Sequence, residues 1–348
     1  MTSTTDIKDK INFCNILSRK SQRHYLNTVN RFKKTTRFYG FFKLFFFCFF
    51  LFETVFCLVS YSIFSSSPIF AVLLGMIFLT IFTYFVLNYY FQTKKPEQLS
   101  TMKDRFIQSC RQSLSIPSKT AEHHLSISQA TLRLSYHLHQ LEYRYFIPSK
   151  IFRFLQSPLE KLSFAFFHED VFRMKEMLLL SGINEHILQI RYTPSDLEVH
   201  ASLANVYVSL ATLYKDILEQ VKYKRLRKKI GILLDTKFEV ASKRAIEELK
   251  ILNDFAPNDP WVHAQLAKSY RSLGKKNEEA KEYEKILEIS PHDYDVLFRL
   301  GVIYFEMGNN AKALQIYDQL RLAPFKKADD LLAYYGIMQD KDLLEETF

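Results

Sequence analysis

The sequence is poor in the residues that make tight turns, with only 8 Gly and 10 Pro among 348 residues. A fold rich in β-strands needs many such turns, so this scarcity favours helices. The 4 Cys are scattered along the chain without the spacing of metal ligands. We therefore expect neither a zinc site nor a disulfide framework, which suits a reducing compartment.

Sequence motifs of common enzymes are missing as well. The chain has no Gly-rich phosphate loop, no nucleophile elbow and no His-Glu-x-x-His zinc motif. Histidines cluster at His123 and His124 and at His137 and His139, but positions one or two apart do not share a helix face. Only one acidic residue, Glu142, follows any of them by three or four positions. We expect no metal, no cofactor and no enzymatic activity.

Two long apolar runs, residues 44–64 and 69–91, stand near the N-terminus. A helix needs roughly 20 predominantly apolar residues to cross a bilayer, and these runs are 21 and 23 residues long. The four residues between them include Pro68, which has no N–H to donate, so a tight reversal is expected. A helical hairpin in a soluble core is the alternative, but both runs are apolar on all sides. The pattern predicts a transmembrane hairpin over residues 44–91.

Basic residues flank this hairpin on both sides. Residues 1–43 contain ten Lys and Arg against two Asp, a net charge of +8, and five more cations follow within residues 94–111. Because Lys and Arg beside a span are retained on the cytoplasmic side, we expect both termini to be cytoplasmic. The segment 1–43 is expected to contact anionic lipid headgroups. Nucleic acid is the competing partner, but membrane orientation already accounts for the charge, so none is expected.

One carboxylate, Glu53, lies near the centre of the first apolar run, where an ionised group costs roughly 2.5–3.5 kcal/mol. In a hairpin folded at Ser66, Glu53 lies level with Thr80 and Thr83, and a protonated Glu53 bonded to either hydroxyl would lose much of this cost. We interpret these three membrane residues as a clasp within the hairpin. A contact between copies in a homo-oligomer and a proton or ion relay are the alternatives.

Residues 93–194 read as a helical linker region. Apolar residues recur at mostly helical spacing over residues 127–146, and Pro148 ends this pattern. A second helix is expected to begin at Pro158 and to end at Gly182. The pattern leaves open whether these helices belong to the same array as the residues that follow.

A pattern that begins near Trp261 recurs about 34 residues later. The corresponding pairs are Leu266/Leu300, Ala267/Gly301, Tyr270/Tyr304, Gly274/Gly308, Tyr283/Tyr317 and Pro291/Pro324. This arrangement resembles the tetratricopeptide repeat family, most clearly over residues 260–291 and 294–324. In that pattern the small residue lets two helices approach, the Tyr fills their gap, Gly ends the first helix and Pro stops the second. The resemblance implies an α-solenoid of stacked helix pairs over residues 195–348.

The match is weaker upstream of residue 260. Leu203, Ala204 and Tyr207 look like part of a first helix and Ala245 and Leu249 like part of a second, with about thirty extra residues between them. This insertion is basic over residues 222–229, so we expect long or broken helices there. A last helix around residues 331–335 is expected to cap the array.

The resemblance also implies a concave groove that binds a peptide or helix of a protein partner. The residues that it places on the groove are Lys268, Arg271, Phe298, Val302 and Phe305. The alternative for the two Phe residues is that they pack against neighbouring helices.

Together these observations predict an all-α protein with four parts: a basic segment 1–43, a transmembrane hairpin 44–91, a linker 93–194 and a repeat domain 195–348. We expect a membrane-anchored scaffold or adaptor, placed in a bacterial inner membrane with both termini cytoplasmic. One alternative is a secreted effector in a host membrane, because the Thr/Ser-rich start and the hairpin are similar to inclusion-membrane proteins of intracellular bacteria. Another is a subunit of a transport complex that uses Glu53.

Overall fold

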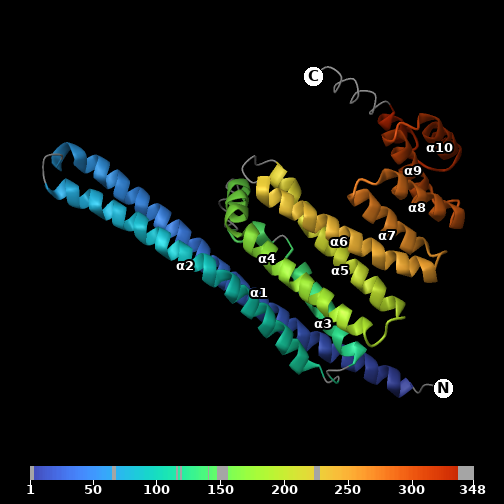
Figure 1. The fold of residues 1–348 in the computed structure, drawn as a ribbon, viewed down its shortest axis with the longest axis horizontal. Coiled ribbons are helices and arrows are strands. Elements are labelled where there is room, and N and C mark those ends of the chain that lie inside the picture. The colour runs from blue at the N-terminus through green and yellow to red at the C-terminus, as the bar shows by residue number, and fades with distance from the viewer. Residues whose placement is uncertain are drawn as a thin grey trace. The chain divides into compact units, whose positions relative to one another are not determined.

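The computed structural model describes residues 4–64, 68–114, 117, 120–139, 141–146, 156–222 and 228–335. Every regular element in these ranges is a helix, so the predicted all-α class is confirmed (Figure 1). The chain divides into two compact units, Met1–Tyr192 and Thr193–Phe348. We call them the anchor unit and the repeat unit. The predicted reversal at residues 65–67 lies outside the described residues.

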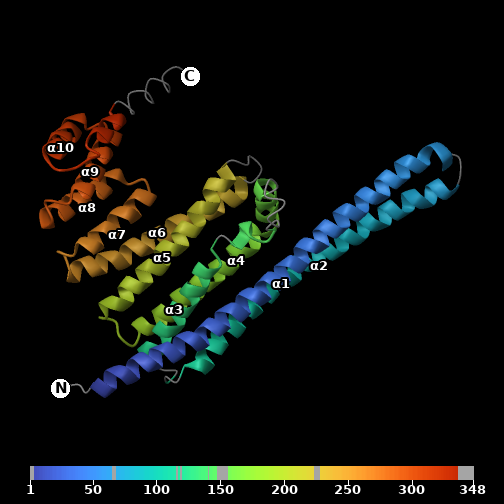
Figure 2. The same ribbon diagram turned by 180° about the vertical axis from the view of Figure 1, so that it is seen from behind.

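Two very long helices dominate the anchor unit. They are α1 (Thr4–Phe64) and α2 (Pro68–Ser113), which lie side by side as a hairpin in both ribbon views (Figures 1 and 2). Aromatic contacts join them, for example Phe42 with Phe91 at 4.7 Å and Tyr61 with Phe70 at 5.6 Å between ring centroids. The most apolar stretch of each helix has no residue buried in the structure. By length and composition both helices could cross a membrane.

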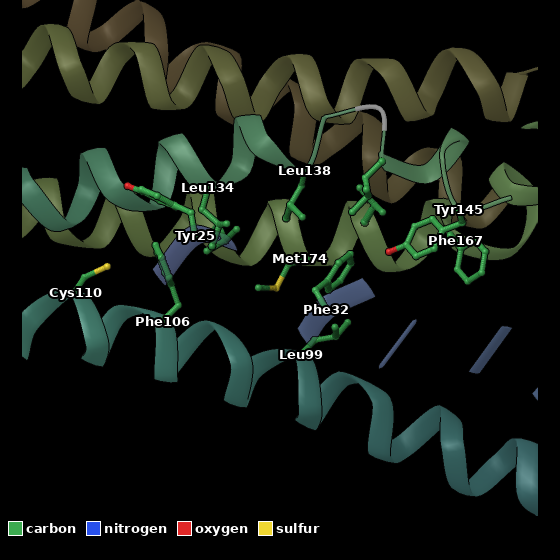
Figure 3. Packing of buried hydrophobic residues seen from close by; sticks show 13 residues of the cluster. Tyr25, Phe32, Leu99, Phe106, Cys110, Leu134, Leu138, Tyr145, Phe167 and Met174 are labelled. Atoms are coloured by element: carbon green, nitrogen blue, oxygen red, sulfur yellow. The ribbon is translucent and has the colours of Figure 1, made fainter. Parts of the chain in front are cut away.

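The basic ends of this hairpin pack against two further helices, α3 (Ala121–His137) and α4 (Gln156–Ile190), with a short 3-10 helix, η1 (Leu141–Tyr143), between them. One buried apolar cluster takes side chains from all four long helices (Figure 3). Phe32 of α1, Leu99 of α2, Leu134 of α3 and Met174 of α4 are each at most 1 % exposed. Residues of the predicted linker therefore share a core with the hairpin.

Gly182 does not end a helix, contrary to the prediction. Helix α4 continues through it to Ile190. A Cβ at this position would lie 2.8 Å from Thr131 Oγ1 of α3, so the missing side chain serves a close approach of two helices. Helix α3 also stops earlier than expected, at His137, and η1 occupies part of the remainder.

Buried polar contacts fix the register of the anchor unit. Lys95 of α2 lies 2.6 Å from Asp170 of α4, whose side chain is 4 % exposed. Burial raises the pKa of Asp170, and the neighbouring Lys95 opposes that rise. Thr36 donates to the hydroxyl of Tyr145 at 2.7 Å. Burial also raises the pKa of the Cys110 thiol to about 12, so this side chain packs as a neutral group.

The repeat unit consists of three consecutive helix pairs. The first pair is long, α5 (Leu197–Lys222) with α6 (Lys228–Phe255), as expected around the insertion, of which residues 223–227 are not described. The others are short: α7 (Pro260–Ser272) with α8 (Lys276–Ile289), and α9 (Tyr294–Glu306) with α10 (Asn310–Leu322). Gly274 and Gly308 follow α7 and α9 with φ of 70° and 74°, a left-handed conformation that favours glycine.

The expected last helix is a 3-10 helix, η3 (Asp329–Tyr334), rather than an α-helix. Its Leu331 is fully buried and packs in one cluster with α9 and α10. A Cβ on Gly301 of α9 would lie 2.8 Å from Leu331 Cδ2, which explains why a small residue stands at this repeat position. Residues 336–348 lie outside the description.

Candidate partner-binding cleft in the repeat unit

The first helix of each pair begins with the same local structure. An Asp two residues after a Pro accepts a backbone hydrogen bond in the first turn, which satisfies a donor that the helix leaves free. The accepting oxygen is Oδ1 in each case, at 3.0 Å from Glu198 N, 2.9 Å from Trp261 N and 3.1 Å from Val296 N. The Pro/Asp pairs are Pro194/Asp196, Pro257/Asp259 and Pro291/Asp293. Helices α5, α7 and α9 thus share one kind of N-terminal capping.

A buried histidine follows the Pro by six positions in the first two pairs. His200 Nδ1 lies 2.6 Å from Glu248 Oε2 of α6, and its Nε2 lies 3.0 Å from the Pro194 carbonyl oxygen. His263 repeats this geometry, with Nδ1 2.7 Å from Glu282 Oε2 of α8 and Nε2 2.7 Å from the Pro257 carbonyl oxygen. Leu297 stands at the equivalent position of the third pair. Each His thus joins the first helix of its pair to the second.

Both ring nitrogens of His200 face acceptors. The Pro194 carbonyl oxygen can only accept, so Nε2 carries a proton, and a second proton on Nδ1 lets the ring donate to the Glu248 carboxylate as well. Burial lowers the pKa of His200, but the hydrogen bonds with Glu248 and Pro194 outweigh it, and the net pKa is raised. The arrangement favours a charged imidazolium that holds α5 against α6.

A small cleft lies among α5, α6 and α7. Its volume is about 40 Å³, and side chains of all three helices line it. Lys215 of α5 and Lys268 of α7 are exposed at this cleft, and no acidic residue lines it. Within the described part of the chain, neither Lys has a carboxylate within 4.0 Å. Both ammonium groups are therefore open to an anionic group from outside.

The wall of the cleft includes a polar atom that lacks a partner. Ser242 of α6 is 2 % exposed, and its Oγ has no hydrogen-bond partner in the structure. A buried hydroxyl without a partner is uncommon in folded proteins. The cleft thus combines two cations with an unsatisfied hydroxyl, which is a suitable setting for a carboxylate or a peptide carbonyl.

The five predicted groove residues do not share one surface in the structure. Lys268 lines the cleft. Arg271 instead donates to Glu279 at 2.6 Å and to the Tyr283 hydroxyl at 2.5 Å, so it ties α7 to α8. Phe298 is half-buried and lies 5.8 Å from the ring of Phe325.

Val302 and Phe305 do not line an open groove. They are only 1 % and 2 % exposed and belong to the buried cluster that α9 forms with α10 and η3. Phe305 also contacts the ring of Tyr335 at 5.8 Å. Packing against neighbouring helices, which the sequence left open as the alternative for Phe305, accounts for both side chains. The placement on the groove is corrected for these two residues.

The three predicted membrane residues are only partly joined. Thr80 donates to Glu53 Oε1 at 3.0 Å, which is one of the two hydrogen bonds expected from the sequence for a hairpin folded near residue 66. The other oxygen, Oε2, is buried without a partner, and no described hydrogen bond joins Thr83 to Glu53. Elsewhere, no group of three or more His, Cys, Asp or Glu among the described residues could hold a metal ion.

Sequence reasoning missed Lys215, Ser242 and the two repeat histidines. The spacing Pro-x-Asp-x-x-Val, which recurs from Pro194, Pro257 and Pro291, was the signal that could have aligned α5 with α7 and α9. With that alignment the His positions fall in register. Ser242 could not have been found in this way, because only tertiary packing reveals that its hydroxyl lacks a partner.

Comparison with known families identifies the last two helix pairs. Profiles described as tetratricopeptide repeat match residues 262–293 and residues 280–333. No curated protein matches the chain. The C-terminal region therefore contains tetratricopeptide repeats, and the resemblance stated from the sequence is confirmed over α7 to η3.

Proposed function

We propose that this protein is a membrane-anchored scaffold whose repeat unit binds a protein partner. Tetratricopeptide repeats fit a role in protein interaction, and they occupy the C-terminal region. The single observation that carries the proposal is the cleft with Lys215, Lys268 and Ser242, because it offers polar groups that the fold itself does not use.

The chemistry of the cleft specifies the kind of partner. Two ammonium groups without carboxylates favour an acidic side chain, and the small volume admits one such group rather than a whole ligand. A peptide or helix that carries a Glu or Asp would place its carboxylate there and lie along the first helices of the pairs. Phe298, which is half-buried, would then contact an apolar residue of the same segment.

Membrane attachment belongs to α1 and α2. We propose that residues 44–64 and 69–91 span the bilayer and that both termini lie in the cytoplasm of a bacterium, with the inner membrane as the location. Of the cations of residues 1–43, those next to the apolar run, such as Lys43, would contact anionic headgroups. If the protein is instead a secreted effector, the same hairpin would span a host membrane. If it is a subunit of a transport complex, Glu53 would have to bind or transfer an ion or proton in addition to its hydrogen bond with Thr80.

The test compares two double variants of the full chain in membranes. Lys215→Glu with Lys268→Glu should lower the yield of a crosslinked partner at least about tenfold, because two attractive contacts become repulsive. Lys250→Glu with Lys281→Glu makes the same charge change on exposed residues of the repeat unit outside the cleft and should leave the yield unchanged. Crosslinking followed by mass spectrometry measures the yield, and circular dichroism checks the fold. Equal capture by both folded variants would contradict the cleft as the binding site.

A second measurement tests the topology. Single cysteines placed near residue 2 and near residue 346 should be labelled from the same side of sealed vesicles, and a cysteine at residue 66 from the other. Opposite labelling of the two ends would rule out a two-span hairpin.

A further inference from the structure

The anchor unit contains a basic groove on the parts of α1 and α2 that lie about ten residues beyond the apolar runs. Its volume is about 490 Å³, and both helices line it. The cations on its rim are Arg31 and Lys34 of α1 and Arg105 of α2, all three exposed. The size falls within the range of small-molecule sites, which is about 300–1,000 Å³.

These three cations are not used by the fold. No acidic residue lines the groove, and in the described ranges none of the three has a carboxylate within ion-pair distance. Other cations of the same unit are paired with buried carboxylates, as Lys95 is with Asp170 and Arg111 is with Glu185, each at 2.6 Å. Arg31, Lys34 and Arg105 differ from these in that all three line one groove and have no carboxylate there, so they are available to an anion from outside.

The surroundings of the cations strengthen their attraction for an anion. Phe106, which is 2 % exposed, and Met102 contribute an apolar surface to the groove. Charges beside such a surface interact more strongly than charges fully surrounded by water. The hydroxyls of Thr28 and Ser109 donate to carbonyls of their own helices, so the donors left for a ligand include the cations, the amide of Asn27 and the hydroxyl of Thr35.

We infer that this groove binds a water-soluble organic phosphate, of about the size of a nucleotide or a sugar phosphate. Several phosphate oxygens would match several cations, and the apolar surface would cover the organic part. Lipid headgroups carry the same phosphate chemistry, but their position is less suitable. Lys34 lies ten residues before residue 44, or about 15 Å along the helix, whereas the headgroup layer extends only about 5–7 Å beyond the hydrocarbon.

The experiment uses the full chain in nanodiscs of phosphatidylcholine and tripolyphosphate as the probe. Calorimetry should show one binding event per chain. The triple variant Arg31→Gln, Lys34→Gln, Arg105→Gln should bind at least about tenfold more weakly, because three charge-assisted contacts become neutral. The matched control is Arg133→Gln, Lys161→Gln, Arg191→Gln, which removes the same residue types from exposed positions of the anchor unit and should bind within twofold of the wild type.

Three outcomes would overturn the inference. One is equal weakening in both triple variants, which would mean that net charge alone attracts the probe. Another is no binding by the wild type in phosphatidylcholine. The third is a phosphoinositide-dependent rise in the unfolding temperature that the groove variant lacks, which would assign the groove to a lipid headgroup. Should the triple variant lose its helical circular dichroism, the single variant Lys34→Gln replaces it, with Lys161→Gln as its control and a severalfold weaker binding as the expected result.

Discussion

The two units stabilise helices in different ways. In the anchor unit one core joins side chains that lie far apart in the sequence, such as Phe32 with Leu138 and Met174. In the repeat unit each helix pair packs against the next, and buried clusters such as that of Leu249, Leu252 and Leu266 join neighbouring helices. A defect in the first unit should therefore spread to all of its helices, whereas a defect in the second should stay near its repeat.

Removal of whole elements should show the largest contrast. A fragment of residues 193–348 retains its neighbouring pairs, so it should be soluble and helical when expressed alone. A fragment of residues 93–192 lacks α1 and half of α2, including Tyr25 and Phe32 of the core, and should aggregate or lose fixed structure. Gel filtration and circular dichroism measure both. An aggregated repeat fragment, or a well-folded 93–192 fragment, would break the comparison.

Single substitutions in the two cores should show how far a local defect spreads in each unit. Phe32→Ala in the anchor unit should cost about 3–5 kcal/mol, since a fully buried ring is replaced by a cavity. Leu266→Ala in the repeat unit should cost about 2–5 kcal/mol. Hydrogen exchange of the full chain should rise throughout α1 to α4 in the first variant and mainly in α6 to α8 in the second. Leu180→Ala, at a position 43 % exposed, is the control and should change exchange little.

The smallest effect concerns pH and should appear in the repeat unit. Because the pKa of His200 is raised on folding, its bond with Glu248 stabilises fully below the unfolded value of about 6.5 and is lost as pH rises through the folded pKa. The expected loss is about 1.5–3 kcal/mol, the scale of a hydrogen bond to a charged group. Urea denaturation of the 193–348 fragment between pH 6 and pH 9 measures it.

The double variant His200→Leu, Glu248→Leu provides the reference for this pH effect. It imitates the apolar residues of the third pair, where Leu297 stands in place of the histidine, so the fold should tolerate it. Its stability should fall less than that of the wild type over the same pH interval. A steeper fall in the variant, or stability of the wild type that rises with pH, would contradict the charged pair.

The sequence allowed us to predict helix ends and repeat positions, which depend on nearby residues. It did not allow us to predict contacts between residues that lie far apart in the sequence. Gly274 and Gly308 end helices as expected, because a left-handed residue is a local requirement. Gly182 looked the same in sequence but serves a helix contact, which depends on Thr131 about fifty residues away. Arg271 occupies a groove position of its repeat, yet Glu279 and Tyr283 engage it. Spacing fixes which face a residue occupies, whereas its partners depend on what the other helices present there.

Helix α1 runs unbroken from Thr4 to Phe64, a length of about 90 Å at 1.5 Å per residue. The residues proposed to contact lipid and the residues of the anchor core therefore belong to one continuous rod without a joint. A change in bilayer thickness that slid this rod along its axis by a single residue would draw Phe32 out of register with Met174 and Leu138. A change in the membrane would then be transmitted along α1 to the buried core of the anchor unit.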